Sequence, residues 1–184
     1  MNLALDVLRY LNAHRGRAIV YSGSGGVDVS VQPMLGWCDS DHAKDVQTRN
    51  SRTGFVFCVA GGAIAWCSKL QPNPAMSTAE AEYVAASHAA REGTWLRRLL
   101  ADLGCAGGLV LHCDSRSAMA MADNTASSAR TKHIDLAIHN IRSTVARQIL
   151  TLHFVPTADN VADHFTKPLG PQLFLRHVTA MGMS

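Results

Sequence analysis

Three short apolar segments follow one another before the first long helical pattern, and this order most restricts how the chain can fold. We predict strands at residues 34–39, 54–59 and 63–68. The second and third are separated by Gly61 and Gly62, which is typical of a β-hairpin. The sheet is therefore expected to begin with strands that run antiparallel to one another.

Strands and helices alternate in the second half of the chain. A long helix is predicted from Ser77, which can cap it together with Glu80, to about Leu103. Further strands are predicted at residues 109–114 and 150–155. Further helices are predicted at residues 3–14, 115–122 and 133–147, with a short strand at 17–21 and a last helix starting at Asp159. Hairpin strands followed by such alternation predict an α/β protein with a mixed sheet flanked by helices.

Composition narrows the class of protein. The 184 residues suffice for one domain, and a hydrophobic content of 47% with 17% charged residues excludes a disordered chain. No apolar run approaches the ~20 residues that cross a bilayer, and Asp6 and Arg9 interrupt the N-terminal apolar pattern. Five cysteines without a C-x-x-C pair are interpreted as reduced thiols, so we expect a cytoplasmic protein without membrane contact. A net charge of +3 is compatible with a polyanionic partner but does not identify one.

Two predicted strands end in the same dipeptide, Cys38-Asp39 and Cys113-Asp114. Sites in α/β sheets form beyond the carboxyl ends of strands, so neighbouring strands would bring the two carboxylates together. Because side chains alternate along a strand, the two cysteines are expected on the opposite face. The alternative is that each aspartate merely caps or ends an element.

The long helix contains two glutamates, and only one can face the sheet. Glu80 and Glu82 are two residues apart and therefore lie about 200° apart around the helix. The positions that share a face with Glu82 are small and apolar, namely Ala85, Ala86, Ala89, Gly93 and Leu96. The face of Glu80 is mixed and wettable. We therefore predict Glu82 as the inward carboxylate, the alternative being a glutamate that reaches solvent past short alanines.

Asp163 in the last predicted helix is the fourth candidate carboxylate. Alone it is compatible with a solvated helix residue. Grouped with Asp39, Glu82 and Asp114, it would form a cluster of like charges, which is favourable chiefly when a cation binds. Ligands that are all oxygen select hard ions such as Mg²⁺ or Mn²⁺.

Five segments resemble the ribonuclease H domain of copia-type LTR retrotransposon Pol polyproteins. They are GWCDSDHAKDVQTRNSRTGFVFCVAGGAIAWCSKLQ, MSTAEAEYVAASHAAREGTWLRRLL, LHCDSRSAM, RTKHIDLAIHNIR and FVPTADNVADHFTKPL. The segment LDVLRYLNAHRGRAIVYSG resembles the end of the connection region of the reverse transcriptase. The resemblance divides the chain into a connection remnant at 1–33, a ribonuclease H domain at 34–170 and a C-terminal tail at 171–184.

The resemblance implies a ribonuclease H-like fold, with a five-stranded mixed sheet of three antiparallel and two parallel strands. It also implies a D-E-D-D catalytic and metal-binding site, which falls on Asp39, Glu82, Asp114 and Asp163. Asp41 shares a strand face with Asp39 and is the reserve for the first position.

The function implied is endonucleolytic hydrolysis of the RNA strand of RNA–DNA hybrids, leaving 5′-phosphates, with two Mg²⁺ ions for which Mn²⁺ can substitute. Expected partners are the hybrid and the reverse transcriptase domain of the same element, in a virus-like particle where the element is intact. Hybrid contacts are assigned to basic and polar side chains, each also compatible with an ordinary surface charge. They are Arg49, Arg52, Lys69, Arg130, Lys132 and His133.

Two other functional classes are alternatives to this one. A catalytically inactive nucleic-acid-binding or structural remnant would keep the fold without the activity. An integrase or transposase of the same fold usually carries its catalytic glutamate after the last strand, whereas Glu82 precedes Asp114.

The segment FVPTADNVAD leaves no room for the histidine-bearing loop that many cellular and retroviral relatives place before the last helix.

Overall fold

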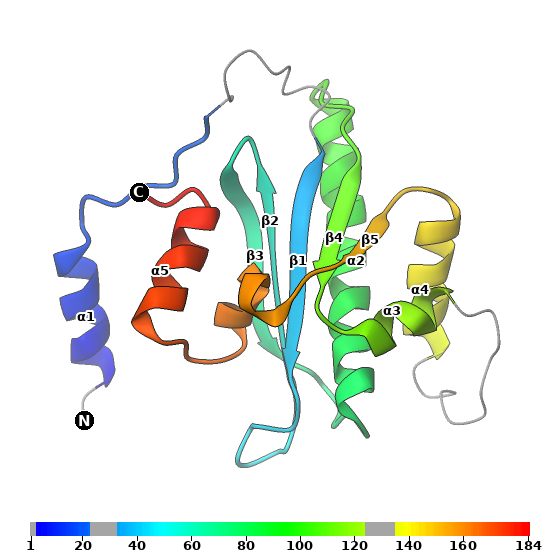
Figure 1. Ribbon diagram of the computed structural model, residues 1–184, viewed down its shortest axis with the longest axis horizontal. Helices are drawn as coiled ribbons and strands as arrows, with labels where there is room; N and C mark the ends of the chain where they lie inside the picture. Colours follow the sequence, from blue (N-terminus) through cyan, green and yellow to red (C-terminus); the bar gives the residue numbers. More distant parts are fainter. Residues whose placement is uncertain (1–2, 23–32, 124–134) are drawn as a thin grey trace.

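A five-stranded sheet forms the centre of the molecule (Figure 1). The computed structural model describes residues 3–22, 33–123 and 135–184. The sheet has the order β3-β2-β1-β4-β5, in which β1 pairs antiparallel with β2 and parallel with β4. The strands are β1 (Met34–Asp41), β2 (Arg52–Val59), β3 (Gly62–Leu70), β4 (Leu109–Cys113) and β5 (Thr151–Phe154). The predicted mixed sheet of three antiparallel and two parallel strands is confirmed.

Helices cover both faces of this sheet. The long helix α2 packs on β1 and β2 and is flanked by α3 and α4, whereas η3 packs on the other side with α5 beside it (Figure 1). The helical elements are α1 (Leu3–Ala13), α2 (Thr78–Asp102), α3 (Arg116–Asp123), α4 (Asp135–Ala146), η2 (Thr157–Asp159), η3 (Val161–Phe165) and α5 (Pro171–Ala180). Within the described ranges, no helix is long and apolar enough to span a bilayer.

The main hydrophobic core lies between the sheet and α2. It joins alternate residues of β1, β2 and β4, among them Cys38, Phe57 and Cys113, to Tyr83 and Ala86 of α2. Burial of these side chains away from water supplies the main favourable free energy of folding. The two cysteines therefore lie on the α2 face of the sheet, as strand alternation predicts.

The start of α2 follows the predicted cap with one difference. The Ser77 side chain accepts a hydrogen bond from the Glu80 backbone N–H at 3.2 Å, but the Glu80 carboxylate accepts from Met76 rather than from Ser77. Glu82 and the apolar face assigned to it are buried. The Glu80 face is wettable only in part: Arg91 is exposed, whereas Tyr83 and Ser87 are buried and α4 packs against α2.

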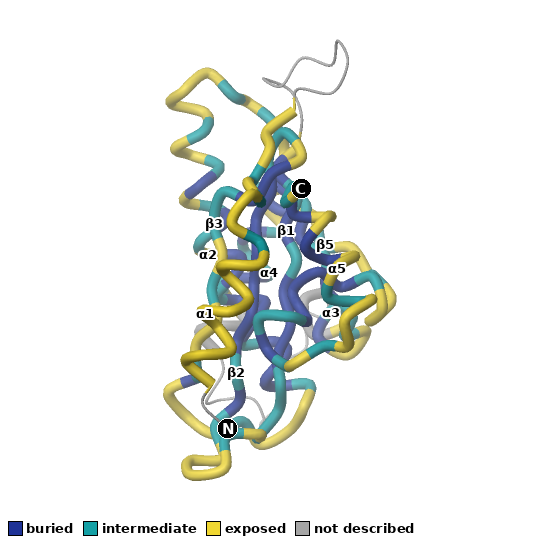
Figure 2. Tube along the Cα trace, turned by 90° about the vertical axis from the view of Figure 1, so that its left-hand side faces the viewer, coloured by how far each residue is buried: buried dark blue, intermediate teal, exposed yellow. Residues whose placement is uncertain are grey.

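The N-terminal arm and the C-terminal residues pair with each other. The predicted strand at 17–21 is only an isolated bridge between Ile19 and Met183, flanked by a 2.8 Å hydrogen bond from the Val20 N–H to the Gly182 carbonyl. Val178 at the end of α5 is buried in a second core against β2. The exposed helix α1 has no buried residue (Figure 2). The domain limits at residues 33 and 170 stay predictions.

The prediction of one continuous last helix beginning at Asp159 is wrong. The chain forms two short 3₁₀ segments, η2 and η3, on either side of Asn160. Asn160 has an extended backbone, and its buried side chain caps η3 by accepting from the Ala162 N–H at 3.2 Å. The same side chain donates to the Cys38 carbonyl at 3.0 Å, so a tertiary contact replaces helix continuity.

Candidate active site

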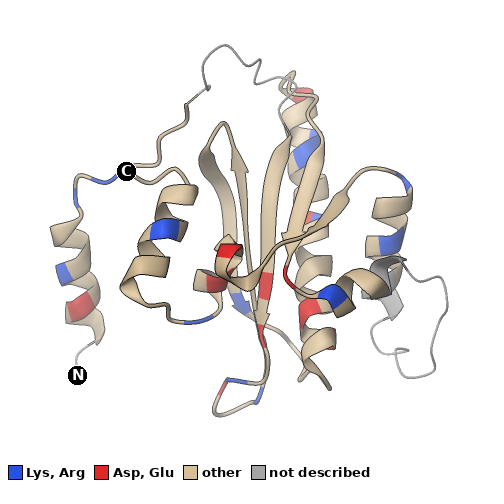
Figure 3. Ribbon diagram, viewed as in Figure 1, with Lys and Arg blue, Asp and Glu red and all other residues tan. Residues whose placement is uncertain are grey.

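Two neighbouring parallel strands bring Asp39 and Asp114 to the same end of the sheet. Cys38 of β1 is in register with Cys113 of β4, so each aspartate follows a paired cysteine. Asp163 of η3 joins them, and carboxylate oxygens of the three residues lie within 4.8 Å of one another. Figure 3 shows acidic residues gathering on β1, η3 and the adjacent part of α2. We call Asp39, Asp114 and Asp163 the acidic trio.

The position of Asp163 depends on how closely η3 approaches the sheet. Gly54 of β2 pairs with Asp39, and a Cβ at Gly54 would lie 2.6 Å from the Thr166 side chain and 2.9 Å from the Cβ of Phe165. Only glycine leaves this space open. Ser68 of β3 adds a hydrogen bond to the Phe165 carbonyl at 2.6 Å. The absence of a side chain at Gly54 therefore lets Asp163 reach the carboxylate on β1.

Thr166 and Lys167 hold the acidic trio from the end of η3. The Thr166 hydroxyl donates to the Asp39 carboxylate and lies 2.9 Å from the Asp163 carbonyl. The Lys167 ammonium lies 2.9 Å from the Asp163 carboxylate and 4.0 Å from that of Asp39. The sequence interpretation missed both residues. Their signal is the spacing of three and four residues after Asp163, which places them near its side chain on one helical turn.

Glu82 approaches the trio from α2 on the other side of the sheet. Its carboxylate lies within 4.8 Å of the Cys113 thiol and an Asp114 oxygen, so Asp114 belongs to both groups. Glu82 is 6% exposed, and its Oε2 atom has no hydrogen-bond partner among the described residues. A buried carboxylate oxygen without a partner is costly, and a bound cation would satisfy it.

Burial and repulsion by neighbouring charges disfavour the ionised form of Asp39 and Glu82. The pKa of Asp39 is raised to about 7, chiefly by burial and also by the Asp163 and Asp114 charges, while Thr166 and Lys167 oppose the rise. Burial, followed by the Asp39 charge, raises the pKa of Glu82 to about 9. A divalent cation would reverse both effects, because it favours the charged form. The four carboxylates, with Asp114 shared by both groups, suit a hard ion such as Mg²⁺ or Mn²⁺.

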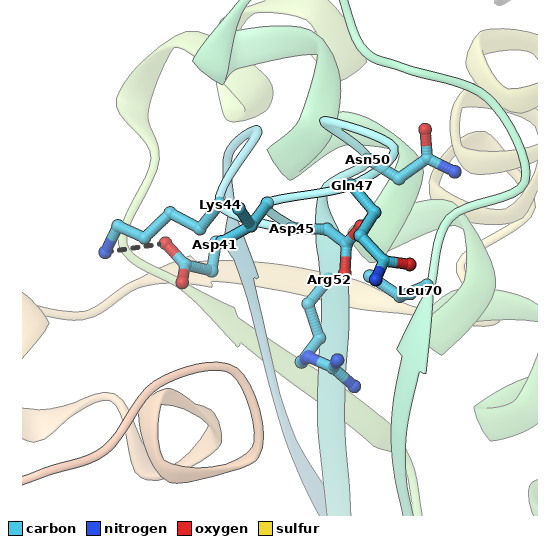
Figure 4. A pocket seen from close by; sticks show the side chains of 8 residues that line it. Asp41, Lys44, Asp45, Gln47, Asn50, Arg52 and Leu70 are labelled. Atoms are coloured by element: carbon cyan, nitrogen blue, oxygen red, sulfur yellow. Dashed lines mark ion pairs between the residues drawn. The ribbon is translucent and has the colours of Figure 1, made fainter.

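Asp41, the reserve for the first position, lies apart from the acidic trio. Its carboxylate forms an ion pair with Lys44 at 2.9 Å, and both residues line a cavity of about 410 Å³ formed mainly by the β1–β2 loop (Figure 4). The same strand therefore carries one aspartate that joins the trio and one that binds a surface lysine.

The predicted hybrid contacts lie at the periphery of the site. Arg49 is exposed in the β1–β2 loop, Arg52 at the start of β2 lines the cavity with Asp41, and Lys69 is exposed on the edge strand β3. In the described part of the chain, no hydrogen bond or ion pair links them to the trio. The other three predicted contacts fall outside the described residues, namely Arg130, Lys132 and His133.

Comparison with known proteins identifies relatives among plant retrotransposons. The chain is 41% identical over 162 residues to the retrovirus-related Pol polyprotein from transposon TNT 1-94 of Nicotiana tabacum, covering 88% of this chain and 12% of the polyprotein. It is 32% identical over 184 residues to that from transposon RE2 of Arabidopsis thaliana, covering 99% of this chain and 12% of the polyprotein. The chain thus spans only a small part of either relative. No protein-family model matches it.

Solved structures with the same fold are more distant in sequence. LC11-RNase H1, isolated from compost by a metagenomic approach, superposes with a TM-score of 0.57 at 14% identity, covering 74% of this chain and 94% of that chain. Its complex with an RNA/DNA hybrid gives a TM-score of 0.53 at 15% identity, covering 72% and 93%. The chain is therefore an RNase H-like domain related to the Pol polyproteins of copia-type retrotransposons.

Proposed function

We propose that the chain is an endonuclease that hydrolyses the RNA strand of RNA–DNA hybrids by two-metal-ion catalysis, as part of the reverse transcription machinery of a retrotransposon. The observation that carries the proposal is the convergence of three carboxylates within 4.8 Å at the ends of two parallel strands, with a fourth close to Asp114. The mutual repulsion in such a cluster destabilises the fold unless cations offset it.

The proposed ligands are Asp39, Glu82, Asp114 and Asp163, with Asp114 contributing to both groups. Two Mg²⁺ ions, or Mn²⁺ in their place, would supply Lewis-acid activation of a water and stabilise charge on the leaving 3′ oxygen, so that the product carries a 5′-phosphate. The carboxylates bind and orient, and Thr166 fixes the direction of the Asp39 carboxylate. No protein side chain needs to act as the nucleophile.

The hybrid is proposed as substrate from the fold and the distribution of charge. LC11-RNase H1, which shares the fold, has been solved in complex with an RNA/DNA hybrid. The sugar-phosphate backbone would be contacted by the exposed side chains of Arg49 and Lys69 and by Arg52 beside the cavity. The same role is proposed for Arg130, Lys132 and His133. Since the relatives are polyproteins, we also propose that the chain works with a reverse transcriptase domain of the same element, inside a virus-like particle.

The test is cleavage of a hybrid labelled on its RNA strand. The intact chain with Mg²⁺ or Mn²⁺ should produce fragments ending in 5′-phosphate. Asp114→Asn should reduce the cleavage rate by at least about 100-fold, which is the usual effect of removing one catalytic group. Asp41→Asn, which removes a carboxylate of the same strand outside the trio, is the matched control and should cleave normally.

The outcome that refutes the proposal is equally defined. A folded chain that binds the hybrid but does not cleave it at high enzyme concentration with either metal would instead be a binding module. Cleavage that survives Asp114→Asn would place the chemistry elsewhere.

A further inference from the structure

Lys167 is positioned as a cation inside an anionic site. Its ammonium lies 2.9 Å from the Asp163 carboxylate and 4.0 Å from the Asp39 carboxylate. Within the described ranges, no other ion pair reaches the acidic trio. The lysine therefore provides part of the positive charge that the trio requires when no metal is bound.

The exposure of the partners is unequal. The side chains of Asp39 and Asp163 are 3% exposed, whereas that of Lys167 is 30% exposed. Its flexible four-carbon stem allows the ammonium to move into water, a movement that the buried carboxylates cannot make. The bond to Asp163 can thus open without unfolding η3.

We propose that Lys167 is a built-in exchangeable counter-ion, which neutralises Asp39 and Asp163 in the metal-free protein and must leave them when a divalent cation binds. The inference rests on the proposed metal site and adds its regulation: the lysine stabilises the empty site and weakens metal binding. The Asp163 carboxylate that it contacts is also a candidate metal ligand, so the lysine and the metal compete for the same carboxylate.

Two effects of the lysine act in the same direction on metal affinity. Its positive charge repels a divalent cation, and its ion pair with Asp163 competes with a metal for that carboxylate. A partly exposed ion pair contributes about 1 kcal/mol, which corresponds to roughly a fivefold change in an equilibrium constant. Removal of the charge should therefore tighten metal binding by about fivefold to tenfold.

The test compares Lys167→Met, which keeps the length of the side chain, with Lys167→Arg, which keeps the charge. Binding of Mn²⁺ alone is measured by titration calorimetry, and thermal unfolding is measured in EDTA at pH 8. Lys167→Met should bind Mn²⁺ more tightly and unfold at a lower temperature in EDTA, while Lys167→Arg should stay close to the natural chain. Lys44→Met is the matched control, since Lys44 pairs with Asp41 at the same 2.9 Å outside the trio and its loss should leave Mn²⁺ affinity unchanged.

Each result separates this inference from the proposed nuclease activity. Tighter Mn²⁺ binding without any cleavage of hybrid supports the counter-ion and refutes the nuclease. Unchanged Mn²⁺ affinity in Lys167→Met, with cleavage in the natural chain, refutes the counter-ion and leaves the nuclease standing. Unchanged Mn²⁺ affinity with weaker hybrid binding would make Lys167 a substrate contact, and absence of Mn²⁺ binding in every protein would also overturn the inference. If Lys167→Met does not fold, Lys167→Gln is measured in its place by the same criteria.

Discussion

Asp39→Asn should stabilise the metal-free protein while abolishing its metal response. Asp39 is 2% exposed, and burial raises its pKa to about 7 from an ordinary value of 3.8. The folded state therefore prefers the protonated acid, and the stability associated with that proton is complete below pH 3.8 and is lost as the pH rises through about 7. Asparagine stays neutral and keeps an oxygen that can accept from Thr166.

The size of the effect follows from the same pKa. A tenfold change in proton affinity corresponds to about 1.4 kcal/mol, so the rise from 3.8 to about 7 amounts to about 4 kcal/mol at pH 8. That figure is an upper bound, because the folded chain relaxes around an ionised group and water enters. We expect about half of it, which for a chain of this size corresponds to a rise of about 4–8 °C in Tm.

The assay is thermal unfolding of both proteins in EDTA between pH 4 and pH 8, repeated at pH 8 with Mg²⁺. The difference in Tm should be small at pH 4 and grow toward pH 8, and Mg²⁺ should raise the Tm of the natural chain only. Asp41→Asn is the control that should show no growing difference, since Asp41 lies outside the trio. A Tm of Asp39→Asn that is lower than that of the natural chain at pH 8 in EDTA would refute the electrostatic reasoning.

Three further substitutions test the site from its other sides. Glu82→Gln should raise Tm at pH 8 in EDTA, because the folded state must hold a proton there that the unfolded chain releases above its ordinary pKa of 4.5, and glutamine carries no such cost. It should also abolish Mg²⁺ stabilisation, and a marked loss of Tm in EDTA would argue against this. Gly54→Ala should cost about 1–3 kcal/mol in urea unfolding, because the new Cβ meets Thr166 and Phe165; unchanged stability would show that η3 is not held closely. Thr166→Val removes the hydrogen bond that lowers the pKa of Asp39, so the acid limb of the pH profile of cleavage should shift to higher pH. Thr166→Ser should restore the original profile, and an unshifted acid limb in Thr166→Val would contradict the positioning role of Thr166.

The sheet and the inward glutamate were predictable because their signals are local. Hydrophobic alternation around Gly61 and Gly62 indicates the hairpin, and the predicted strands agree with the observed ones to within two residues at each end. The periodicity of α2 identifies Glu82 because its neighbours on that face are alanines and a glycine. Both signals arise from burial of one face of a regular element, which leaves a repeating pattern in the sequence.

The region after β5 was less predictable because tertiary contacts determine its form. Asp159 begins a plausible helical pattern, but the side chain of Asn160 forms a hydrogen bond with the backbone of β1 and interrupts it. The peripheral cations carry no periodic signal, so the sequence suggests that Arg49 and Lys69 are surface charges without placing them relative to the trio. A buried amide that bonds to a distant strand likewise leaves no local pattern.

The electrostatic state of the site depends on this less predictable region. Strand alternation places Asp39 on one face of the sheet, but it does not determine how much water reaches the carboxylate. η3 covers that face. Its close packing against Gly54 buries Asp39 and brings the Asp163 charge beside the Asp39 carboxylate. Because burial is the largest cause of the raised pKa of Asp39, the requirement for a cation arises from packing of η3 rather than from the acidic residues alone. A loosened η3 would leave the carboxylates in place along the sequence and yet hydrate them, which would lower both the cost of the empty site and its demand for metal.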